Sequence, residues 1–340
     1  MASSSANRAV ILREYAPSGL PEPGKHFTVD NVDEPGALGD GEVTVQLKYI
    51  SVDPYLRGRM KDRESYFPAF EIGQPGANFA VFEVVASKSA AHPVGSTWAG
   101  TTPWVLRQNL SAEKLASVWR ADHEGIPESA SVGVLGMPGA TAYFGYLELC
   151  APKEGETLVV SGAAGAVGSI VVQLGKIRGC RVIGIAGSDE KCAFLKSIGA
   201  DVALNYKHPN LEAAIREAAP KGVDQYFDNT GGDIKDAVYA NLNSGARVSA
   251  CGAISGYNLA EAPIGRTWEW TIVTKQIRIE GFLCSRWITQ WPKAFSELAQ
   301  WIREGKIKYE ETIENGFENI IPAFNKMMQG DNTGKMVIYV

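Results

Sequence analysis

The sequence is poor in three features that would each indicate a particular class of protein. Its five cysteines include no CxxC pair, so a disulfide framework is excluded and reduced thiols in the cytosol are expected. Lys and Arg number 33 against 38 Asp and Glu, which excludes the basic excess of a nucleic-acid or anionic-membrane surface. No apolar run is long enough to cross a bilayer, and residues 1–8 form a polar, frayed end without a secretory signal. We therefore expect a cytoplasmic protein with no nucleic-acid or membrane partner.

A zinc site is not expected either, because it needs closely grouped Cys, His and Glu ligands. No cysteine precedes Cys150, and of the histidines His26, His92, His123 and His208 only His123 has a neighbouring glutamate. We interpret each histidine as a lone surface side chain. The sequence thus predicts no metal, and metal-assisted alcohol oxidation is not expected.

The length of 340 residues predicts two domains, because it exceeds what one compact core usually holds. Short β-type runs at 9–12, 43–50, 79–85 and 104–106, broken by Pro and Gly, predict a β-rich, barrel-like domain. From residue 156 apolar strands alternate with glycine-bearing turns and helices, which is typical of a doubly wound parallel sheet. We expect an α/β fold, with the β-rich domain at 1–130 and 305–340 and a Rossmann domain at 131–304.

Six predicted strands complete one Rossmann sheet. They lie at 157–160, 181–186, 202–204, 225–228, 246–250 and 277–282, with helices at 169–176, 191–198, 211–218 and 292–304. A last, edge-like strand at 335–340 follows. Because the Rossmann set is already complete, we expect this strand to join the sheet of the first domain.

A glycine-rich turn follows the first Rossmann strand and precedes a helix. Residues 162–168 read Gly-Ala-Ala-Gly-Ala-Val-Gly, and such small residues let the backbone approach a pyrophosphate at the helix N-terminus. The spacing is GxxGxxG rather than GxGxxG, so a tight turn used only for packing is the alternative. The strand and helix on either side favour a dinucleotide site.

The end of the second strand predicts NADPH rather than NADH. An NAD site usually has an Asp or Glu there to bond the ribose hydroxyls, whereas this chain has Ala-Gly-Ser at 186–188. Ser188 and Lys191 can offer a hydroxyl and a positive charge to a 2′-phosphate, although Lys191 could also be only a solvated helix residue. Asp189 and Glu190 complicate this prediction, and we place them in the first helical turn, where acidic side chains are common.

Seven stretches, in order along almost the whole chain, resemble one known family. They are residues 51–60, 136–145, 163–168, 187–191, 227–232, 251–258 and 330–335. The chain resembles the zinc-independent medium-chain dehydrogenase/reductase family, close to the leukotriene B4 12-hydroxydehydrogenase/prostaglandin reductases and the NADP-dependent alkenal double-bond reductases. The resemblance implies a GroES-like catalytic domain, a Rossmann domain that binds NADPH, and a homodimer.

The resemblance also implies which residues contact the cofactor and which act in catalysis. The implied cofactor contacts are Gly165, Ala166, Val167, Gly168, Ser188, Lys191, Tyr206, Asn229, Cys251, Gly252, Ala253, Ile254, Ser255, Tyr257, Phe282, Leu283, Cys284 and Asn332. Loop anchoring is the alternative interpretation of Tyr206 and Asn229, which follow the third and fourth strands. The implied catalytic residues are Tyr257, near the nicotinamide ribose, and Tyr55 and Tyr66, which line the substrate cleft.

The expected reaction is reduction of the C=C bond of an α,β-unsaturated aldehyde or ketone. Hydride added at the β-carbon leaves an enolate, so the site needs a donor for the carbonyl oxygen and a proton for the α-carbon. Tyrosine suits both tasks, and a structural hydrogen bond is the alternative role of Tyr257. For Tyr55 the alternative is a turn fixed by Pro54. Several family members have a tyrosine where this chain has Thr274, which leaves the substrate range open.

Six aromatic side chains could form an apolar substrate wall, although each alone is more often a core residue. They are Phe67, Phe70, Trp268, Trp270, Trp287 and Trp291. Two other functions stay open. An NADPH-dependent quinone oxidoreductase would share the zinc-free scaffold, and an NADPH-binding, non-catalytic protein would keep the nucleotide site without turnover.

Overall fold

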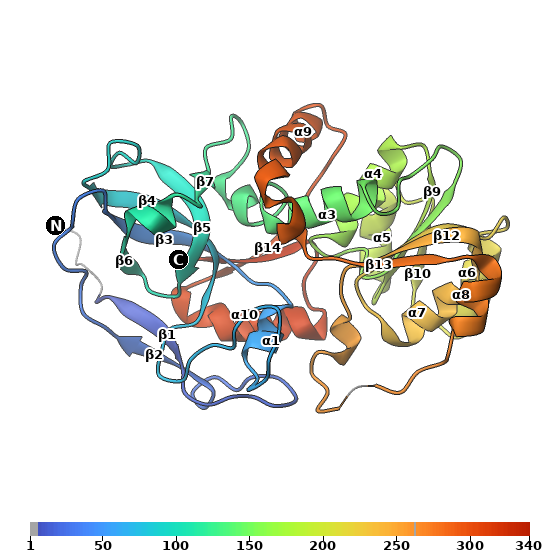
Figure 1. Cartoon of the computed structure of the whole chain (residues 1–340), viewed down its shortest axis with the longest axis horizontal. Helices are drawn as coiled ribbons and strands as arrows, with labels where there is room; N and C mark the ends of the chain where they lie inside the picture. Colours follow the sequence, from blue (N-terminus) through green and yellow to red (C-terminus); the bar gives the residue numbers. More distant parts are fainter. Residues whose placement is uncertain (1–5, 262) are drawn as a thin grey trace. The chain divides into compact units, whose positions relative to one another are not determined.

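The computed structural model describes residues 6–261 and 263–340 (Figure 1). The frayed end predicted at the N-terminus falls largely on residues 1–5, which lie outside the described residues, as does residue 262. Contacts divide the chain into unit 1 (Met1–Val132, Thr312–Asp331 and Met336–Val340) and unit 2 (Gly133–Glu311 and Asn332–Lys335). The domain boundaries drawn from the sequence, at 131 and 305, remain a proposal.

Unit 1 is rich in antiparallel β-structure. A ribbon pairs β1 (Arg8–Leu12) with β2 (Phe27–Asn31), and a seven-stranded sheet has the order β14-β15-β3-β4-β5-β7, with β6 paired to β3. The strands of that sheet are β3 (Val43–Ser51), β4 (Ala77–Ser87), β5 (Thr97–Pro103), β6 (Arg107–Leu110), β7 (Trp119–Arg120), β14 (Glu311–Asn315) and β15 (Lys335–Tyr339). Its helices are α1 (Leu56–Arg59), α2 (Ala112–Leu115) and α10 (Ile320–Gln329), with 3-10 turns at Glu128–Val132 and Phe317–Asn319. The predicted β-rich domain is confirmed.

The terminal strand joins the sheet of unit 1, as its sequence predicts. β15 pairs antiparallel with β3, and Ile338 stands opposite Ile50. It does not lie at the edge of the sheet, because β14 flanks its other side. Val337 and Ile338 are fully buried, so the end of the chain contributes to the core of unit 1.

The strand predicted at 104–106 is wrong. These residues form the bend between β5 and β6, and their N–H groups donate to separate neighbouring segments instead of one partner strand. Trp104 is buried, with its ring centroid 6.0 Å from Phe27 and 5.5 Å from Phe70. Gly76 leaves room for the indole, since a Cβ there would lie 2.3 Å from Trp104 Cε3. Residues 104–106 are apolar because they pack in the core. In the sequence, so short an apolar run cannot be distinguished from a strand.

Unit 2 contains a six-stranded parallel sheet in the order β10-β9-β8-β11-β12-β13. Its strands are β8 (Thr157–Val160), β9 (Arg181–Ala186), β10 (Val202–Asn205), β11 (Val223–Asp228), β12 (Leu242–Ala250) and β13 (Arg278–Gly281). Within this sheet the chain forms β8 first and continues outward through β9 to β10. It then returns to the other side of β8 to form β11. This reversal is a topological switch point, at whose carboxyl edge ligands bind in such sheets.

Helices pack on this sheet (Figure 1), with α4 on β8 and β9, and α5 on β9 and β10. The helices of unit 2 are α3 (Met137–Leu147), α4 (Gly168–Ile177), α5 (Asp189–Ser197), α6 (Leu211–Ala218), α7 (Gly232–Tyr239), α8 (Glu269–Lys275) and α9 (Trp291–Arg303), with 3-10 turns at Ile254–Gly256 and Cys284–Gln290; α9 packs on α3. All four residues of β8 are buried, as expected for a strand covered on both faces. The predicted α/β class with a doubly wound parallel sheet is confirmed. Among the described residues, no helix is both long and apolar enough to span a bilayer.

Candidate active site

The glycine-rich turn follows β8 and leads directly into α4. Gly162 has a φ of 56°, and its carbonyl accepts the Gly165 N–H at 3.1 Å. A Cβ on Gly168 would lie 2.4 Å from the Gly162 carbonyl oxygen, so only glycine fits at the start of the helix. Within the described residues, no side chain caps α4. Its N-terminus therefore offers backbone N–H groups and a positive dipole to an anion.

The segment at 332–335 lies against this turn. Gly334 N–H donates to the Ala164 carbonyl at 2.7 Å, and Gly334 forms an isolated bridge with Gly165. The Asn332 side-chain amide donates to the Gly334 carbonyl at 2.9 Å. Asn332, which the sequence predicts as a cofactor contact, is thus placed beside the turn from the far end of the chain.

Asp228, at the end of β11, connects the strands at this edge. Its Oδ1 accepts the Ser161 hydroxyl at 3.0 Å and the Tyr226 phenol at 2.7 Å. Its carbonyl accepts the N–H groups of Cys251 and Gly252 at 2.9 and 3.0 Å. Burial and the adjacent carboxylate raise the pKa of Tyr226 well above its ordinary value, so the phenol stays a donor. Sequence reasoning missed Asp228 and Ser161 because their contact joins strands far apart in the chain.

Asn229 follows Asp228 and is tied to the neighbouring strand. Its Nδ2 donates to the Ser161 carbonyl at 2.7 Å, and its backbone N–H donates to Ser161 Oγ at 3.0 Å. The anchoring role considered as an alternative is therefore present. Asn229 also lies beside the glycine-rich turn, because a Cβ on Gly162 would be 3.3 Å from Asn229 Cβ. Its contact with a cofactor stays a prediction.

Three predicted cofactor residues come together at the end of β9. Ser188 caps α5, its Oγ accepting the Lys191 N–H at 3.3 Å. Tyr206 follows β10, and its ring covers Gly187, where a Cβ would lie 3.0 Å from Tyr206 Cε1. The Tyr206 side chain is exposed, so its hydroxyl can reach a ligand at this edge.

Residues 251–257 fold over the end of β11 and carry Tyr257. The Tyr257 phenol oxygen accepts the Ala253 N–H at 3.1 Å, and Ser255 Oγ donates to the Thr230 carbonyl at 2.6 Å. A Cβ on Gly252 would lie 3.0 Å from the phenol oxygen, so the absence of a side chain at this position makes room for the phenol. Tyr257 is half-buried. Its phenol thus lies at the carboxyl edge of the sheet, within the stretch predicted to contact the cofactor.

The predicted contacts after β13 have different surroundings. The Phe282 ring lies against Gly145 of α3, where a Cβ would be 2.2 Å from Cζ, and it packs on Trp287 with centroids 5.8 Å apart. Leu283 is exposed and Cys284 is half-buried. Burial and the nearby Cys284 thiol raise the pKa of Cys251, at the end of the adjacent strand. The half-buried Phe282 ring therefore packs between Gly145 and Trp287, and a cofactor could contact only the Phe282 backbone or the exposed part of the ring.

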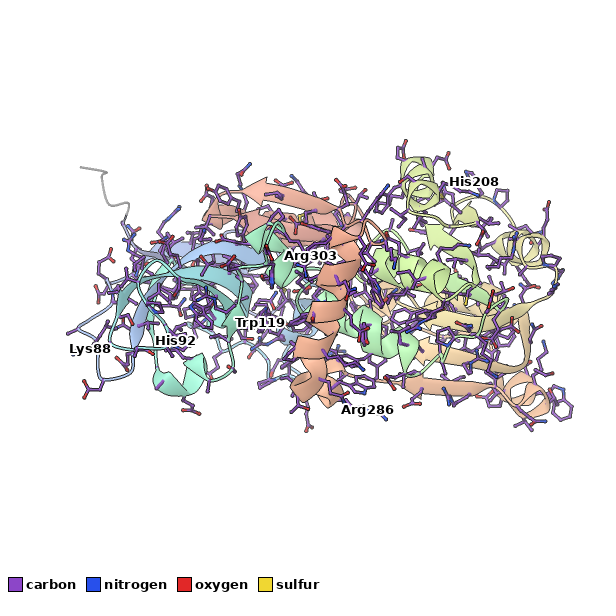
Figure 2. All side chains as sticks on the ribbon, turned by 90° about the horizontal axis from the view of Figure 1, so that it is seen from above. Lys88, His92, Trp119, His208, Arg286 and Arg303 are labelled. Atoms are coloured by element: carbon purple, nitrogen blue, oxygen red, sulfur yellow. The ribbon has the colours of Figure 1, made fainter. Side chains whose placement is uncertain are left out.

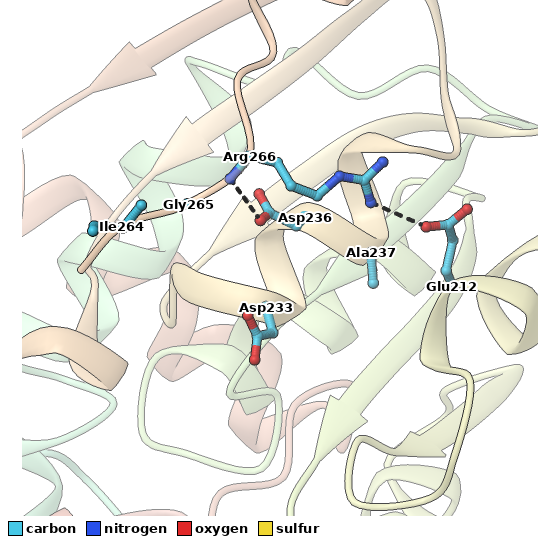
Figure 3. A pocket seen from close by; sticks show the side chains of 7 residues that line it. All are labelled: Glu212, Asp233, Asp236, Ala237, Ile264, Gly265 and Arg266. Atoms are coloured by element: carbon cyan, nitrogen blue, oxygen red, sulfur yellow. Dashed lines mark hydrogen bonds and ion pairs between the residues drawn. The ribbon is translucent and has the colours of Figure 1, made fainter.

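The loop after Tyr257 is anchored at its far end (Figure 3). Asp236 of α7 accepts the Trp268 indole N–H at 2.7 Å. It also accepts the Arg266 backbone N–H at 3.4 Å, while Arg266 Nη1 lies 3.3 Å from Glu212 of α6. Burial alone would raise the pKa of Asp236, but the Trp268 hydrogen bond and the Lys235 charge lower it. Asp236, Arg266 and Glu212 line a cavity of about 400 Å³ that contains none of the predicted site residues. We interpret this cavity as part of the loop anchor.

In unit 1, the predicted tyrosines share one aromatic cluster. The Phe67 ring centroid lies 5.4 Å from Tyr55 and 5.1 Å from Tyr66. The Tyr55 hydroxyl donates to Asn78 Oδ1 at 2.6 Å, whereas Tyr66 is 56% exposed. The structure brings Tyr55 and Tyr66 together, and their role in catalysis stays a prediction.

Most of the candidate aromatic wall packs in the core. Phe70, Trp268, Trp287 and Trp291 are buried, and only Phe67 and Trp270 are exposed. Trp287 stacks on Phe144 of α3 with the rings 8° from parallel. The core interpretation therefore holds for four of the six side chains.

The prediction of surface histidines is wrong for two of the four. His26 and His92 are buried, and His123 is half-buried, with its Nε2 2.8 Å from Ser131 Oγ. His26 Nδ1 accepts the Glu22 N–H, and the His92 ring centroid lies 4.3 Å from that of Trp98. Imidazole is small and half apolar, so it packs inside once its nitrogens are satisfied. In the described part of the chain, no group of three or more His, Cys, Asp or Glu side chains could hold a metal ion.

Comparison with known proteins gives two family matches and full-length relatives. The zinc-binding dehydrogenase family matches residues 166–302, and the N-terminal domain of oxidoreductase matches residues 8–118. Prostaglandin reductase 1 of Bos taurus is 42% identical over 316 residues, covering 92% of this chain and 93% of that protein. The NADP(+)-dependent 2-alkenal reductase of Nicotiana tabacum is 38% identical, with 100% and 99% covered. The crystal structure of CurA from Vibrio vulnificus in complex with NADPH has a TM-score of 0.91 at 37% identity, covering 98% of this chain and 99% of that one.

The switch point, the glycine-rich turn and these matches define a dinucleotide-dependent oxidoreductase scaffold. The chain belongs to the medium-chain dehydrogenase/reductase family, in its zinc-independent branch. The family predicted from the sequence is therefore confirmed. Although one matching family is named for zinc, the His, Cys, Asp and Glu side chains of the described residues do not fit that ion.

Replacing Asp236 with alanine is expected to loosen the loop between Tyr257 and Trp268. The change removes the acceptor of the Trp268 and Arg266 N–H groups, at a cost of about 1–3 kcal/mol of stability. Limited trypsin digestion should then cleave after Arg266 faster than in the wild type. Asp233→Ala, on the same helix and lining the same cavity, is the matched control. Equal cleavage rates in the two variants would contradict the anchoring role.

Proposed function

We propose that the chain reduces the C=C bond of α,β-unsaturated aldehydes and ketones with NADPH. The observation that carries this proposal is the position of the Tyr257 phenol, at the sheet edge that also holds the glycine-rich turn. A hydrogen-bond donor at that edge suits a carbonyl oxygen that becomes negative during reduction. Relatives named prostaglandin reductase and 2-alkenal reductase support the same substrate class.

NADPH fits the residues of unit 2. The start of α4 and the half-exposed residues 165–167 would hold the pyrophosphate. Ser188, Lys191 and Tyr206 would hold the 2′-phosphate, because a hydroxyl, an ammonium and a phenol all donate to phosphate oxygens. The NADPH complex of CurA and the NADP-dependent relative agree with this cofactor. Further proposed contacts are Gly168, Asn229, Cys251, Gly252, Ala253, Ile254, Ser255, Tyr257, Phe282, Leu283, Cys284 and Asn332.

NADPH, when bound, supplies a hydride to the β-carbon of the substrate, which leaves an enolate. Tyr257 is proposed to donate a hydrogen bond to the enolate oxygen and then to give its proton to the α-carbon, after which a solvent proton restores the phenol. The Ala253 N–H donates to the same phenol oxygen, which strengthens the Tyr257 O–H as a donor. Neither task requires a strong base or a metal.

Tyr55 and Tyr66 are proposed to line the substrate site from unit 1. Their cluster with Phe67 offers an apolar surface that carries two phenol groups. Thr274 does not replace the phenol found in several relatives, because its hydroxyl donates to the Trp270 carbonyl of its own helix at 2.8 Å. We therefore propose that Tyr257 is the main proton donor in this chain.

The two alternatives differ from this proposal in their products. A quinone oxidoreductase would consume NADPH with a benzoquinone and leave enals untouched. A non-catalytic protein would bind NADPH without turning over either substrate. The enone reductase is favoured because full-length relatives at about 40% identity are named prostaglandin reductase and 2-alkenal reductase.

A homodimer through the outer edge of β13 is part of the proposal. In the described sheet β13 is an end strand, so its outer N–H and C=O groups can pair with a second copy. Exposed apolar side chains surround it: Ile279, Leu283 and Ile288, with Trp270 and Val273 on α8. A patch of this kind usually marks a protein interface. The predicted cytosolic location is also kept as a proposal, which the five free thiols support.

The function is tested by following NADPH oxidation with an alkenal, an aryl enone, a 15-oxo-prostaglandin and a benzoquinone. We expect turnover of the enal or enone, resistance to a chelator, and a saturated carbonyl as product. NADH should be the weaker cofactor, because no carboxylate stands at the end of β9. Turnover of the quinone alone would favour the first alternative, and NADPH binding without any turnover would favour the second.

Tyr257→Phe is expected to lower kcat by about 10²-fold, because it removes a donor to the developing oxyanion. The Kd for NADPH, measured by tryptophan fluorescence, should change by less than about threefold, since the ring and its packing stay. Tyr206→Phe is the matched control and should raise the KM for NADPH while kcat is kept. If both variants changed only KM, the proposed role of Tyr257 would be wrong.

Light scattering after gel filtration should give a mass near twice the chain mass of 36.6 kDa. Ile279→Asp places a charge on the outer edge of β13 and should shift the protein toward the monomer. Val94→Asp, at an exposed position of unit 1, should leave the mass unchanged. A monomeric wild type would refute the homodimer.

A further inference from the structure

The start of α5 contains an electrostatic conflict. Asp189 and Glu190 occupy its first turn, where carboxylates stabilise a helix through the dipole. The same turn contains Ser188 and Lys191, which are proposed to bind the 2′-phosphate. A carboxylate that turned toward this site would repel a phosphate, and it could instead bond the ribose hydroxyls of NADH. Preference for NADPH therefore depends on where these carboxylates are held.

Asp189 is held by residues that follow β10. Its Oδ1 accepts Asn205 Nδ2 at 2.9 Å, and His208 Nε2 lies 3.5 Å from the same oxygen. Figure 2 labels His208 at the surface of unit 2, where its side chain is 64% exposed. The side-chain Oδ1 of Asn205 accepts the Lys207 backbone N–H at 3.1 Å. Because a backbone N–H can only donate, this contact fixes the orientation of the amide and turns its NH₂ group toward Asp189.

This contact lies on a different side of α5 from the proposed phosphate ligands. Asp189 and Cys192 line a cavity of about 150 Å³ together with Asn205 and His208. Ser188, Lys191 and Tyr206 do not line it. Tyr206 instead lies over Gly187, on the side of the β9 end. The Asn205 amide thus keeps the Asp189 carboxylate on the β10 side of the helix.

We propose that Asn205 is a positioning residue for cofactor selectivity. By holding Asp189 against β10, it lets the helix keep its acidic first turn while the ribose 2′ position stays open to a phosphate. His208 supports the same contact from the following turn. The inference rests on the proposed NADPH function and adds to it a residue that is not among the proposed cofactor contacts.

Glu190 provides a matched control, because it lies in the same turn without the Asn205 contact. Its own backbone N–H and the Ser188 hydroxyl hold the pKa of Glu190 below its usual value. The Glu190 charge is therefore present in every variant that leaves it in place. Removing it should raise affinity for NADPH whether or not Asn205 is present.

The test compares Kd values for NADPH and NADH, measured by tryptophan fluorescence, in a double-mutant cycle. Asn205→Ala should reduce the NADPH preference by about twofold to fivefold, as expected for an exposed charge that is released. Asp189→Asn should remove this effect, so that Asn205→Ala changes nothing further in its presence. In the Glu190→Gln background, Asn205→Ala should keep its full effect. His208→Ala should give a smaller shift in the same direction without altering β10.

Two results would overturn the inference. One is an unchanged preference in Asn205→Ala, and the other is an effect that persists with Asp189→Asn, which would place the cause in the Tyr206 turn. A wild type that binds both cofactors equally would overturn the cofactor proposal as well. Wild-type preference for NADPH with unchanged variants would leave the proposed function standing and reject only the role of Asn205.

Discussion

The buried carboxylate of Asp228 is the interaction on which the candidate site depends. A carboxylate is costly to bury, and here hydrogen bonds from the Ser161 hydroxyl, the Tyr226 phenol and the N–H groups after β11 offset that cost. The backbone carbonyl of Asp228 accepts the N–H groups of Cys251 and Gly252, which directly follow β12. One residue thus ties together the end of β11, the turn after β8 and the stretch that carries Tyr257.

The rest of the edge follows from this arrangement and from parallel topology. Parallel strands end at one edge, so the glycine-rich turn, Asn229 and residues 251–257 meet there although they are distant in the chain. The positive end of α4 and the cap of α5 then offer two places for negative charge. Between them, acidic side chains must be kept aside, and Asn205 performs that task for Asp189.

The sequence predicts unit 2 well because its signals are local. The central strands β8, β9 and β11 are largely buried, and all six strands lie where the pattern indicates them. Unit 1 is less predictable, because its short strands resemble other apolar runs. The run at 104–106 forms a bend whose tryptophan fills the core, and strands such as β2 and β6 contain too many polar residues to stand out.

The site residues also divide into those that the local sequence predicts and those that only the three-dimensional structure reveals. Gly162, Gly168 and Ser188 are found from the sequence because a turn or a cap needs them locally. The contacts of Asp228 with Ser161 and of Asn205 with Asp189 join different strands or elements, so they become visible only once strand order is known. The buried His26 and His92 were missed for the same reason, since composition does not show what surrounds an imidazole.

The central claim is that hydride reaches the β-carbon of an enone in a site built without metal. It is tested most directly by turning over an aryl enone with NADPH that carries deuterium at the transferred position. The account predicts a saturated ketone with deuterium at its β-carbon, identified by NMR, and a solvent proton at its α-carbon. Deuterium at the carbonyl carbon, with an allylic alcohol as product, would contradict it.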